Sequence, residues 1–235
     1  MIVDRKNHLN KFYELLFSLE RNLEGTRKLE ESTGRMDWPL RGIYFFQEPG
    51  EFRNGSRSEM RIVRVGTHAL KTGSRTKLWT RLSQHKGQVS TGGGNHRGSI
   101  FRLIVGASLI ERESYDFPTW GKESSAPRVV RKNELPLEQA VSDVIGEMPF
   151  LCLAINDEPG PASLRGYIER NAIGLLSDYG KEPIDSPSDN WLGYFCNRER
   201  VRTSGLWNSN HVNEEYDPAF LDVLEDLIEQ MGRTK

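Results

Sequence analysis

Three cationic side chains recur at four-residue spacing in the chain: Lys77, Arg81 and His85. On a helix this spacing places all three on one face. The guanidinium of Arg81 forms a planar fork that suits two phosphate oxygens at once. His85 could share in proton transfer or donate a hydrogen bond to a phosphate, whereas Lys77 suits a phosphate contact. The alternative is an ordinary solvated helix face, with His85 offsetting the dipole at the helix end.

These cations belong to a strongly basic segment of a nearly neutral chain. The 235 residues include 32 Lys or Arg and 33 Asp or Glu. Residues 52–102 hold eleven of the basic residues and a single acid, Glu59, so this segment carries a net charge of +10 and the remainder carries −11. The asymmetry favours a polyanion as partner, although a basic face paired with the acidic remainder would give the same composition.

Composition excludes several classes of protein. No apolar run approaches the roughly 18 residues that span a bilayer, so we exclude a membrane protein. The N-terminus lacks the apolar core of a signal peptide, and Cys152 and Cys196 form no CxxC pair. We therefore expect a cytoplasmic protein without a disulfide scaffold or a thiolate zinc cluster. The Gly-rich loop 90–99 lacks the GK[ST] ending of a P-loop, which argues against nucleotide binding there.

The hydrophobic pattern predicts the elements that must position the cations. An apolar stripe predicts a helix over about 4–23. Short aromatic and β-branched runs predict strands at 41–47 and 60–66, joined by a turn-rich connection. The next predicted helix, at about 75–86, carries the cationic face.

The second half of the chain continues the alternation of strands and helices. The pattern predicts strands at 100–106 and 148–155. It predicts helices at 134–147, 162–176 and 218–231. Residues 107–133 are polar and irregular, which predicts a surface insertion, and 191–213 predicts loop or short strand. Asp217 and Pro218 suit the start of the last helix.

Four short motifs occur in order along these elements. They are GIY at 42–44, RVG at 64–66, LWTRLSQH at 78–85 and IERNAI at 168–173. Together they resemble the GIY-YIG nuclease superfamily over about 39–176. The resemblance implies an α/β fold of the α+β kind, in which a small, mixed, mainly antiparallel sheet is flanked by helices. Helical extensions at both termini would surround this core.

The resemblance also implies a chemistry. Hydrolysis of a phosphodiester bond needs a positioned water, a proton acceptor, cations that stabilise the developing charge and usually a metal. We expect Tyr44 to act as the base or to orient the water, and Glu169 to hold Mg²⁺ or Mn²⁺. Arg81 and His85 would stabilise the phosphate. The structural alternatives are a core aromatic for Tyr44 and an ion pair with Arg165 for Glu169.

One position departs from the family pattern, because Arg64 stands where the second motif should begin with tyrosine. We expect Arg64 to lie beside Tyr44 across the hairpin, where it could hold phosphate and stabilise a phenolate. The residues expected to contact the nucleic acid are Arg64, His68, Lys71, Lys77, Arg97 and Asn208.

The family also uses an asparagine after the acidic helix. Three residues are candidates: Asn171, Asn190 and Asn208. The segment 204–212 gathers Trp207, Asn208, Asn210 and His211, which are either turn residues or a second wall of the site.

The leading hypothesis is a metal-dependent endonuclease that acts on DNA, with a homodimer suiting a symmetric cut. The alternative is a catalytically impaired nucleic-acid-binding module of the same fold, which lost activity with the second tyrosine. A weaker alternative is an assembly subunit that docks a partner through its end helices. We expect three parts: a helical extension at 1–38, a nuclease core at 39–176 with an insertion at about 107–133, and a C-terminal extension at 177–235.

Overall fold

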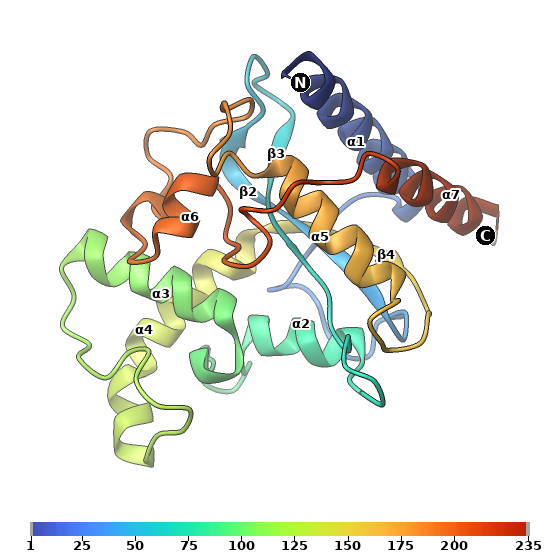
Figure 1. Ribbon diagram of the computed structural model, residues 1–235. Coiled ribbons are helices and arrows are strands. Elements are labelled where there is room, and N and C mark those ends of the chain that lie inside the picture. Colours follow the sequence, from blue (N-terminus) through green and yellow to red (C-terminus); the bar gives the residue numbers. More distant parts are fainter. Residues whose placement is uncertain (1, 234–235) are drawn as a thin grey trace.

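An antiparallel sheet organises the chain, as the computed structural model shows for residues 2–233 (Figure 1). Its strands are β1 (Arg27–Lys28), β2 (Gly42–Phe52), β3 (Met60–Gly66) and β4 (Pro149–Ala154). They lie in the order β1-β4-β2-β3, and each neighbouring pair is antiparallel. The predicted fold class is therefore confirmed, with β2 in the interior of the sheet and β3 at one edge.

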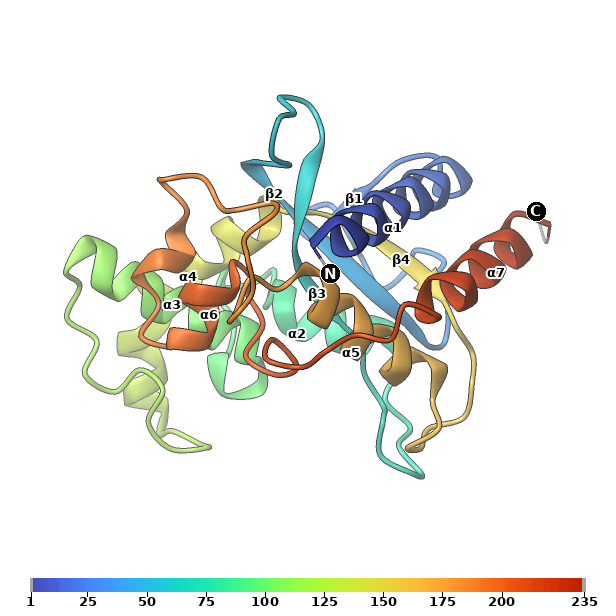
Figure 2. The ribbon, with the colours of Figure 1, turned by 45° about the horizontal axis from the view of Figure 1, so that its top comes forward.

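Helices cover both faces of this sheet (Figures 1 and 2). Side chains alternate along β2, so Ile43 and Phe45 face one side while Tyr44 and Phe46 face the other. The first side is covered by α1 (Ile2–Leu23), α5 (Leu164–Leu176) and α7 (Phe220–Arg233). The second side is covered by α2 (Leu78–Lys86), α3 (Ile100–Glu113) and α4 (Arg128–Glu147).

The predicted helices at the two ends of the chain are confirmed, and they pack against each other. Phe12 of α1 lies with its ring centroid 6.2 Å from that of Phe220 of α7, within the apolar core of the first face. Lys11 and Glu225 pair across the two helices at 2.6 Å. Asp217 accepts a hydrogen bond from the backbone N–H of Ala219, as expected of a residue that caps α7.

The predicted strand at 100–106 is wrong, because these residues begin helix α3. The side chain of Ser99 caps the helix by accepting a hydrogen bond from the backbone N–H of Arg102. An unbroken apolar run fits either a buried strand or a buried helix. The buried residues Phe101, Ile104 and Leu109 extend the pattern at helical spacing past residue 106, and that extension is the signal for a helix.

The predictions for 107–133 and 191–213 also differ from the structure. Helix α3 continues to Glu113 and α4 already begins at Arg128, with Pro136 inside it, so only the residues between them are irregular. Residues 191–213 contain the short helices η2 (Leu192–Phe195) and α6 (Glu199–Ser204) instead of a strand. A further short helix, η1 (His96–Gly98), precedes α3.

A buried ionic network joins the three helices of the second face. The fully buried guanidinium of Arg102 pairs with Glu138 of α4 at 2.7 Å. The same guanidinium donates to the backbone carbonyl of His85 at the end of α2, at 2.8 Å. The other oxygen of Glu138 accepts from the backbone N–H and the ring of His96. Because Arg102 binds the backbone of His85 directly, this network fixes a residue of the candidate site.

Truncation of Arg102 should therefore destabilise the fold strongly. Arg102→Ala leaves the buried carboxylate of Glu138 without its cation, and we expect the free energy of unfolding to fall by about 3–5 kcal/mol. Arg112→Ala is the matched control on the same helix, because Arg112 pairs with Glu113 at the surface and should contribute less than about 1 kcal/mol. Urea denaturation measures both, and similar losses in the two variants would contradict the assignment.

Candidate active site

Tyr44 and His85 form a buried hydrogen-bonded pair between the sheet and α2. The Tyr44 hydroxyl lies 2.9 Å from Nε2 of His85, and Nδ1 of His85 lies 2.7 Å from the hydroxyl of Ser99. Burial and the positive charge of Arg81 lower the pKa of His85 well below its ordinary value. The ring is therefore neutral at pH 7, so one nitrogen donates and the other accepts. The three side chains form one continuous chain of hydrogen bonds.

Gly66 determines where the Tyr44 phenol lies. The two residues are directly opposite each other in the antiparallel pairing of β2 and β3. A methyl group added at Gly66 would lie 2.5 Å from the Tyr44 hydroxyl, well inside van der Waals contact. The Tyr44 ring therefore packs against the backbone of β3 at Gly66. The glycine of the second motif leaves the space that the tyrosine of the first motif occupies.

Arg64 projects to the same face as Tyr44, two residues before Gly66. Its guanidinium donates to the backbone carbonyl of Trp207 and lies 4.5 Å from the ring centroid of Phe101. Burial lowers the pKa of Arg64, and the nearby Tyr44 and Glu169 act in the opposite direction. The Nε atom of Arg64 is buried without a hydrogen-bond partner among the described residues. Arg64 thus keeps an unused donor close to the phenol.

Arg81 adds a second guanidinium at the more exposed side of this group. It donates to the side chain of Gln84 at 3.0 Å and to the carbonyl of Gly98 at 3.1 Å. Neither partner is charged, so the positive charge of Arg81 is not neutralised by a carboxylate there. This charge lowers the pKa of both Arg64 and His85, which places the three side chains in one electrostatic environment.

Glu169 of α5 reaches the same place at the end of β3. One carboxylate oxygen accepts a hydrogen bond from the backbone N–H of Thr67 at 3.1 Å. Burial raises the pKa of Glu169, whereas His211, Arg64 and Arg81 lower it. The predicted alternative, an ion pair with Arg165, is not formed, because Arg165 pairs with Asp157. A half-buried carboxylate close to cations therefore remains available to a ligand.

The structure therefore brings the four predicted catalytic side chains close to one another and adds Arg64. They come from β2, β3, α2 and α5, which are far apart in sequence. Ser99, which contacts His85, was not predicted. His211, which was named only as a turn residue or part of a second wall, lowers the pKa of Glu169. The position of Ser99 directly before an apolar run and the position of His211 within an Asn-rich segment were the sequence features that could have indicated these contacts.

A comparison with family models matches the GIY-YIG domain over residues 3–234, nearly the whole chain. The chain belongs to the GIY-YIG family. Comparisons with curated proteins and with solved structures gave no match. Membership implies nuclease activity in general, and GIY-YIG nucleases act on nucleic acid, generally with a divalent metal. Each helix of the described chain is too short or too polar to cross a membrane.

The residues present fit a loosely held divalent ion of the kind that GIY-YIG nucleases use. No cluster of three or more His, Cys, Asp or Glu side chains suited to a metal occurs within residues 2–233. Glu169 supplies one half-buried carboxylate, which accepts a hydrogen bond from the backbone N–H of Thr67. Mg²⁺ is commonly bound by one or two carboxylates, with water and phosphate oxygens completing its shell. The donor set therefore suits an ion that binds together with a phosphodiester.

The predicted contacts with nucleic acid divide into two groups in this GIY-YIG domain. Lys71 and Lys77 are exposed on the loop that leads from the end of β3 to α2. In contrast, Arg97 is engaged by Glu134 in a two-pronged ion pair, and His68 is buried. The structure thus leaves two lysines free for backbone phosphates and argues against such contacts for Arg97 and His68.

The candidate asparagines also have assigned contacts. Asn208 is buried, and its carboxamide donates to the carbonyl of Val65 and accepts from the backbone N–H of the same residue. Asn171 donates to the carbonyl of Tyr167 and accepts from the backbone N–H of Asp217. Asn190 lies exposed in a turn. Asn208 therefore extends the edge of β3, so its predicted contact with nucleic acid is not supported by the geometry.

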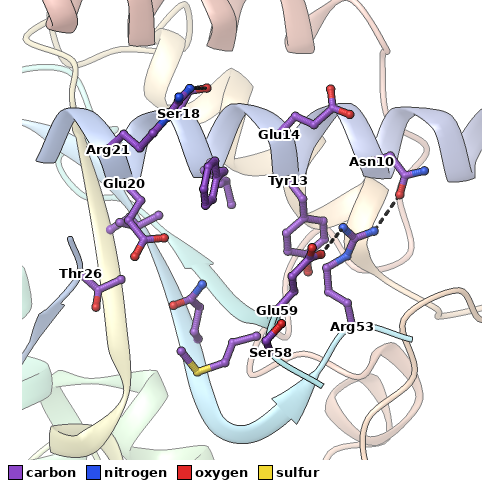
Figure 3. A pocket seen from close by; sticks show the side chains of 15 residues that line it. Asn10, Tyr13, Glu14, Ser18, Glu20, Arg21, Thr26, Arg53, Ser58 and Glu59 are labelled. Atoms are coloured by element: carbon purple, nitrogen blue, oxygen red, sulfur yellow. Dashed lines mark hydrogen bonds and ion pairs between the residues drawn. The ribbon is translucent and has the colours of Figure 1, made fainter. Parts of the chain in front are cut away.

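A cavity of about 810 Å³ lies away from this site, between α1 and the β2–β3 hairpin (Figure 3). Arg53 stands at its wall and donates to Asn10 and Glu59. None of the five candidate site residues lines this cavity. The catalytic geometry is thus independent of it.

The contact between Gly66 and Tyr44 predicts a steric sensitivity. Gly66→Ala should displace the phenol, break its hydrogen bond with His85 and lower the free energy of unfolding by about 1–3 kcal/mol. Gly160→Ala is the control, because the nearest atom to its added methyl would be 3.8 Å away. Denaturation and histidine ¹⁵N NMR report the two effects. An unchanged His85 spectrum in Gly66→Ala would contradict this packing.

Buried His68 predicts an acid-dependent loss of stability. Burial and the nearby Arg165 lower the pKa of His68 to about 4, below the unfolded value of about 6.5. The unfolded chain thus binds the proton more readily, so the contribution of His68 is complete above pH 6.5 and is lost as the pH falls toward 4. The loss amounts to up to about 3 kcal/mol. His68→Asn should show a correspondingly shallower decline in urea denaturation between pH 7 and 4.5; an identical decline would refute the assignment.

Proposed function

We propose that the protein is a divalent-metal-dependent endonuclease that hydrolyses phosphodiester bonds in DNA. The observation that supports this is the convergence of a phenol, a neutral imidazole, two guanidiniums and a half-buried carboxylate near the end of β3. This combination provides proton transfer, charge stabilisation and a metal ligand in one place.

Tyr44 and His85 would move the proton of the attacking water. The Tyr44 hydroxyl takes the proton from water while its own proton passes to Nε2 of His85, whose neutral ring has an unprotonated nitrogen there. Because burial and Arg81 lower the pKa of His85, the ring would hold this proton only briefly. Nδ1 of His85 then donates to Ser99, whose hydroxyl keeps the ring in that orientation. The hydroxide forms a bond to phosphorus as the bond to the leaving oxygen breaks. The leaving oxygen takes a proton from solvent water, and the extra proton of His85 returns to solvent through Tyr44, which closes the balance.

The two arginines would hold the phosphate during this step. Arg64 is fixed by Trp207 and Phe101, so its unpartnered Nε–H is oriented before substrate arrives. Donors fixed in advance stabilise developing charge without reorganisation at the moment of reaction. Arg81 is more exposed and suits a second phosphate oxygen, while Lys71 and Lys77 would contact neighbouring phosphates.

Glu169 would hold the metal ion. When bound, the ion supplies Lewis-acid stabilisation of the phosphate oxygens. The hydrogen bond from Thr67 orients the carboxylate and leaves its second oxygen free of described partners. The metal is Mg²⁺ or Mn²⁺, both of which accept carboxylate oxygen.

A nicking assay on supercoiled plasmid with Mg²⁺ or Mn²⁺ tests this proposal. We expect Tyr44→Phe and Glu169→Gln to reduce the cleavage rate at least about 100-fold. Arg64→Ala should lower the rate of cleavage more than the affinity for DNA, because Arg64 acts on the reacting phosphate. Lys6→Ala, an exposed lysine on α1, should behave as the wild type.

Two results would count against these roles. DNA binding without cleavage under either metal would favour a binding module that lost activity with the second tyrosine. Equal, small effects of Arg64→Ala on rate and affinity would remove Arg64 from the catalytic group.

A further inference from the structure

His211 lies in an unusual turn between α6 and α7. Its backbone has a φ of 63°, in the left-handed region that side chains other than glycine seldom adopt. The carbonyl of His211 accepts from the backbone N–H of Glu214, which closes the turn. The imidazole is therefore presented by a backbone conformation that the surrounding contacts must maintain.

The turn is fastened on both sides to elements of the candidate site. Three residues earlier, the carboxamide of Asn208 pairs with both backbone groups of Val65 on β3. One residue later, the carbonyl of Val212 accepts from the hydroxyl of Ser177, at the end of α5. Strand β3 leads to Thr67, which binds Glu169, and α5 carries Glu169 itself. His211 is thus held between the two elements that position this carboxylate.

One of the two ring nitrogens of His211, Nε2, is available to bind a ligand. Nδ1 lies 2.7 Å from a carboxylate oxygen of Glu214, an acceptor that retains a proton on Nδ1. The other nitrogen, Nε2, makes no hydrogen bond within the described residues, and the side chain is 33% exposed. Histidines that bind metals nearly always donate their second ring N–H to a carboxylate, a carbonyl or water.

The electrostatic environment of Glu169 agrees with a position of His211 near its carboxylate. Among the charged side chains that lower the pKa of Glu169, His211 has the largest effect, ahead of Arg64 and Arg81. The contacts of Asn208 with β3 and of Val212 with the end of α5 place the turn beside the elements that carry Glu169, and this electrostatic effect agrees with that geometry. A carboxylate oxygen and an imidazole nitrogen are both ligands that divalent transition metals accept.

We propose that Nε2 of His211 is a second protein ligand of the divalent ion held by Glu169, with Glu214 as the residue that orients the ring. This inference rests on the proposed metal role of Glu169. Imidazole is a better ligand for Mn²⁺ and later transition metals than for Mg²⁺, which prefers oxygen alone. The site should therefore bind Mn²⁺ more tightly than Mg²⁺.

The full-length protein and Mn²⁺ alone, without DNA, provide the test. Electron spin-echo spectroscopy of the Mn²⁺-bound wild type should show coupling to one imidazole nitrogen, which changes on ¹⁵N-histidine labelling. His211→Asn should lose this coupling and bind Mn²⁺ at least about tenfold more weakly in calorimetry. Asparagine tolerates the left-handed backbone, so the turn is retained. Glu214→Gln should keep the coupling and weaken binding by a smaller factor.

His8→Gln is the matched control, because His8 contacts Tyr216 on the α1 side of the molecule. It should leave both the coupling and the affinity unchanged. Absence of nitrogen coupling in the wild type, or wild-type affinity in His211→Asn, would overturn the inference. If Glu169→Gln still abolished Mn²⁺ binding in that case, the proposed function would stand without His211. If Glu169→Gln also bound Mn²⁺ normally, both the inference and the proposed metal site would fall.

Discussion

The close approach of Tyr44 to Gly66 is the contact on which the candidate active site depends. Antiparallel pairing places the two residues opposite each other, and the missing side chain of Gly66 makes room for the phenol. From this position the hydroxyl reaches His85 on α2. The period of two along a strand then directs Arg64 to the same face. A single cross-strand contact thus sets the positions of three side chains of the candidate site.

The substitution of the second tyrosine by Arg64 changes the character of the site. A guanidinium buried beside a phenol needs compensation, which comes from the Trp207 carbonyl and the Phe101 ring. The segment that supplies Trp207 also supplies Asn208 and His211. The C-terminal part of the chain is therefore joined to the candidate site through the Trp207 carbonyl on Arg64 and through Asn208 on the backbone of Val65.

Sequence predicted three of the four strands of the described chain, because the runs at 41–47, 60–66 and 148–155 are apolar and bounded by turns. It missed β1, which has only two polar residues, and the continuation of β2 through the turn-rich residues to Phe52. It was wrong at 100–106, because an unbroken apolar run does not distinguish a buried strand from a buried helix. The motifs also indicated that Tyr44 and His85 would meet, and the structure places them in contact, while their catalytic roles remain a prediction.

The remaining contacts of the site could not be predicted from sequence. The partnership of His85 with Ser99 and the sequestration of Arg97 by Glu134 depend on how α3 and α4 pack, and helix packing is decided by distant residues. The same holds for His68, which looked like a phosphate contact within a basic segment but lies buried. Charge and spacing identify cations without showing which of them acquire partners inside the fold.

The most direct test of the central claim is a crystal structure of the protein with uncleaved duplex DNA and Ca²⁺ in place of the catalytic metal. If the account is right, one backbone phosphate will contact both Arg64 and Arg81, lie beside the Tyr44 hydroxyl, and share the cation with Glu169. A complex in which the DNA follows another surface, with no phosphate near Tyr44, would contradict it.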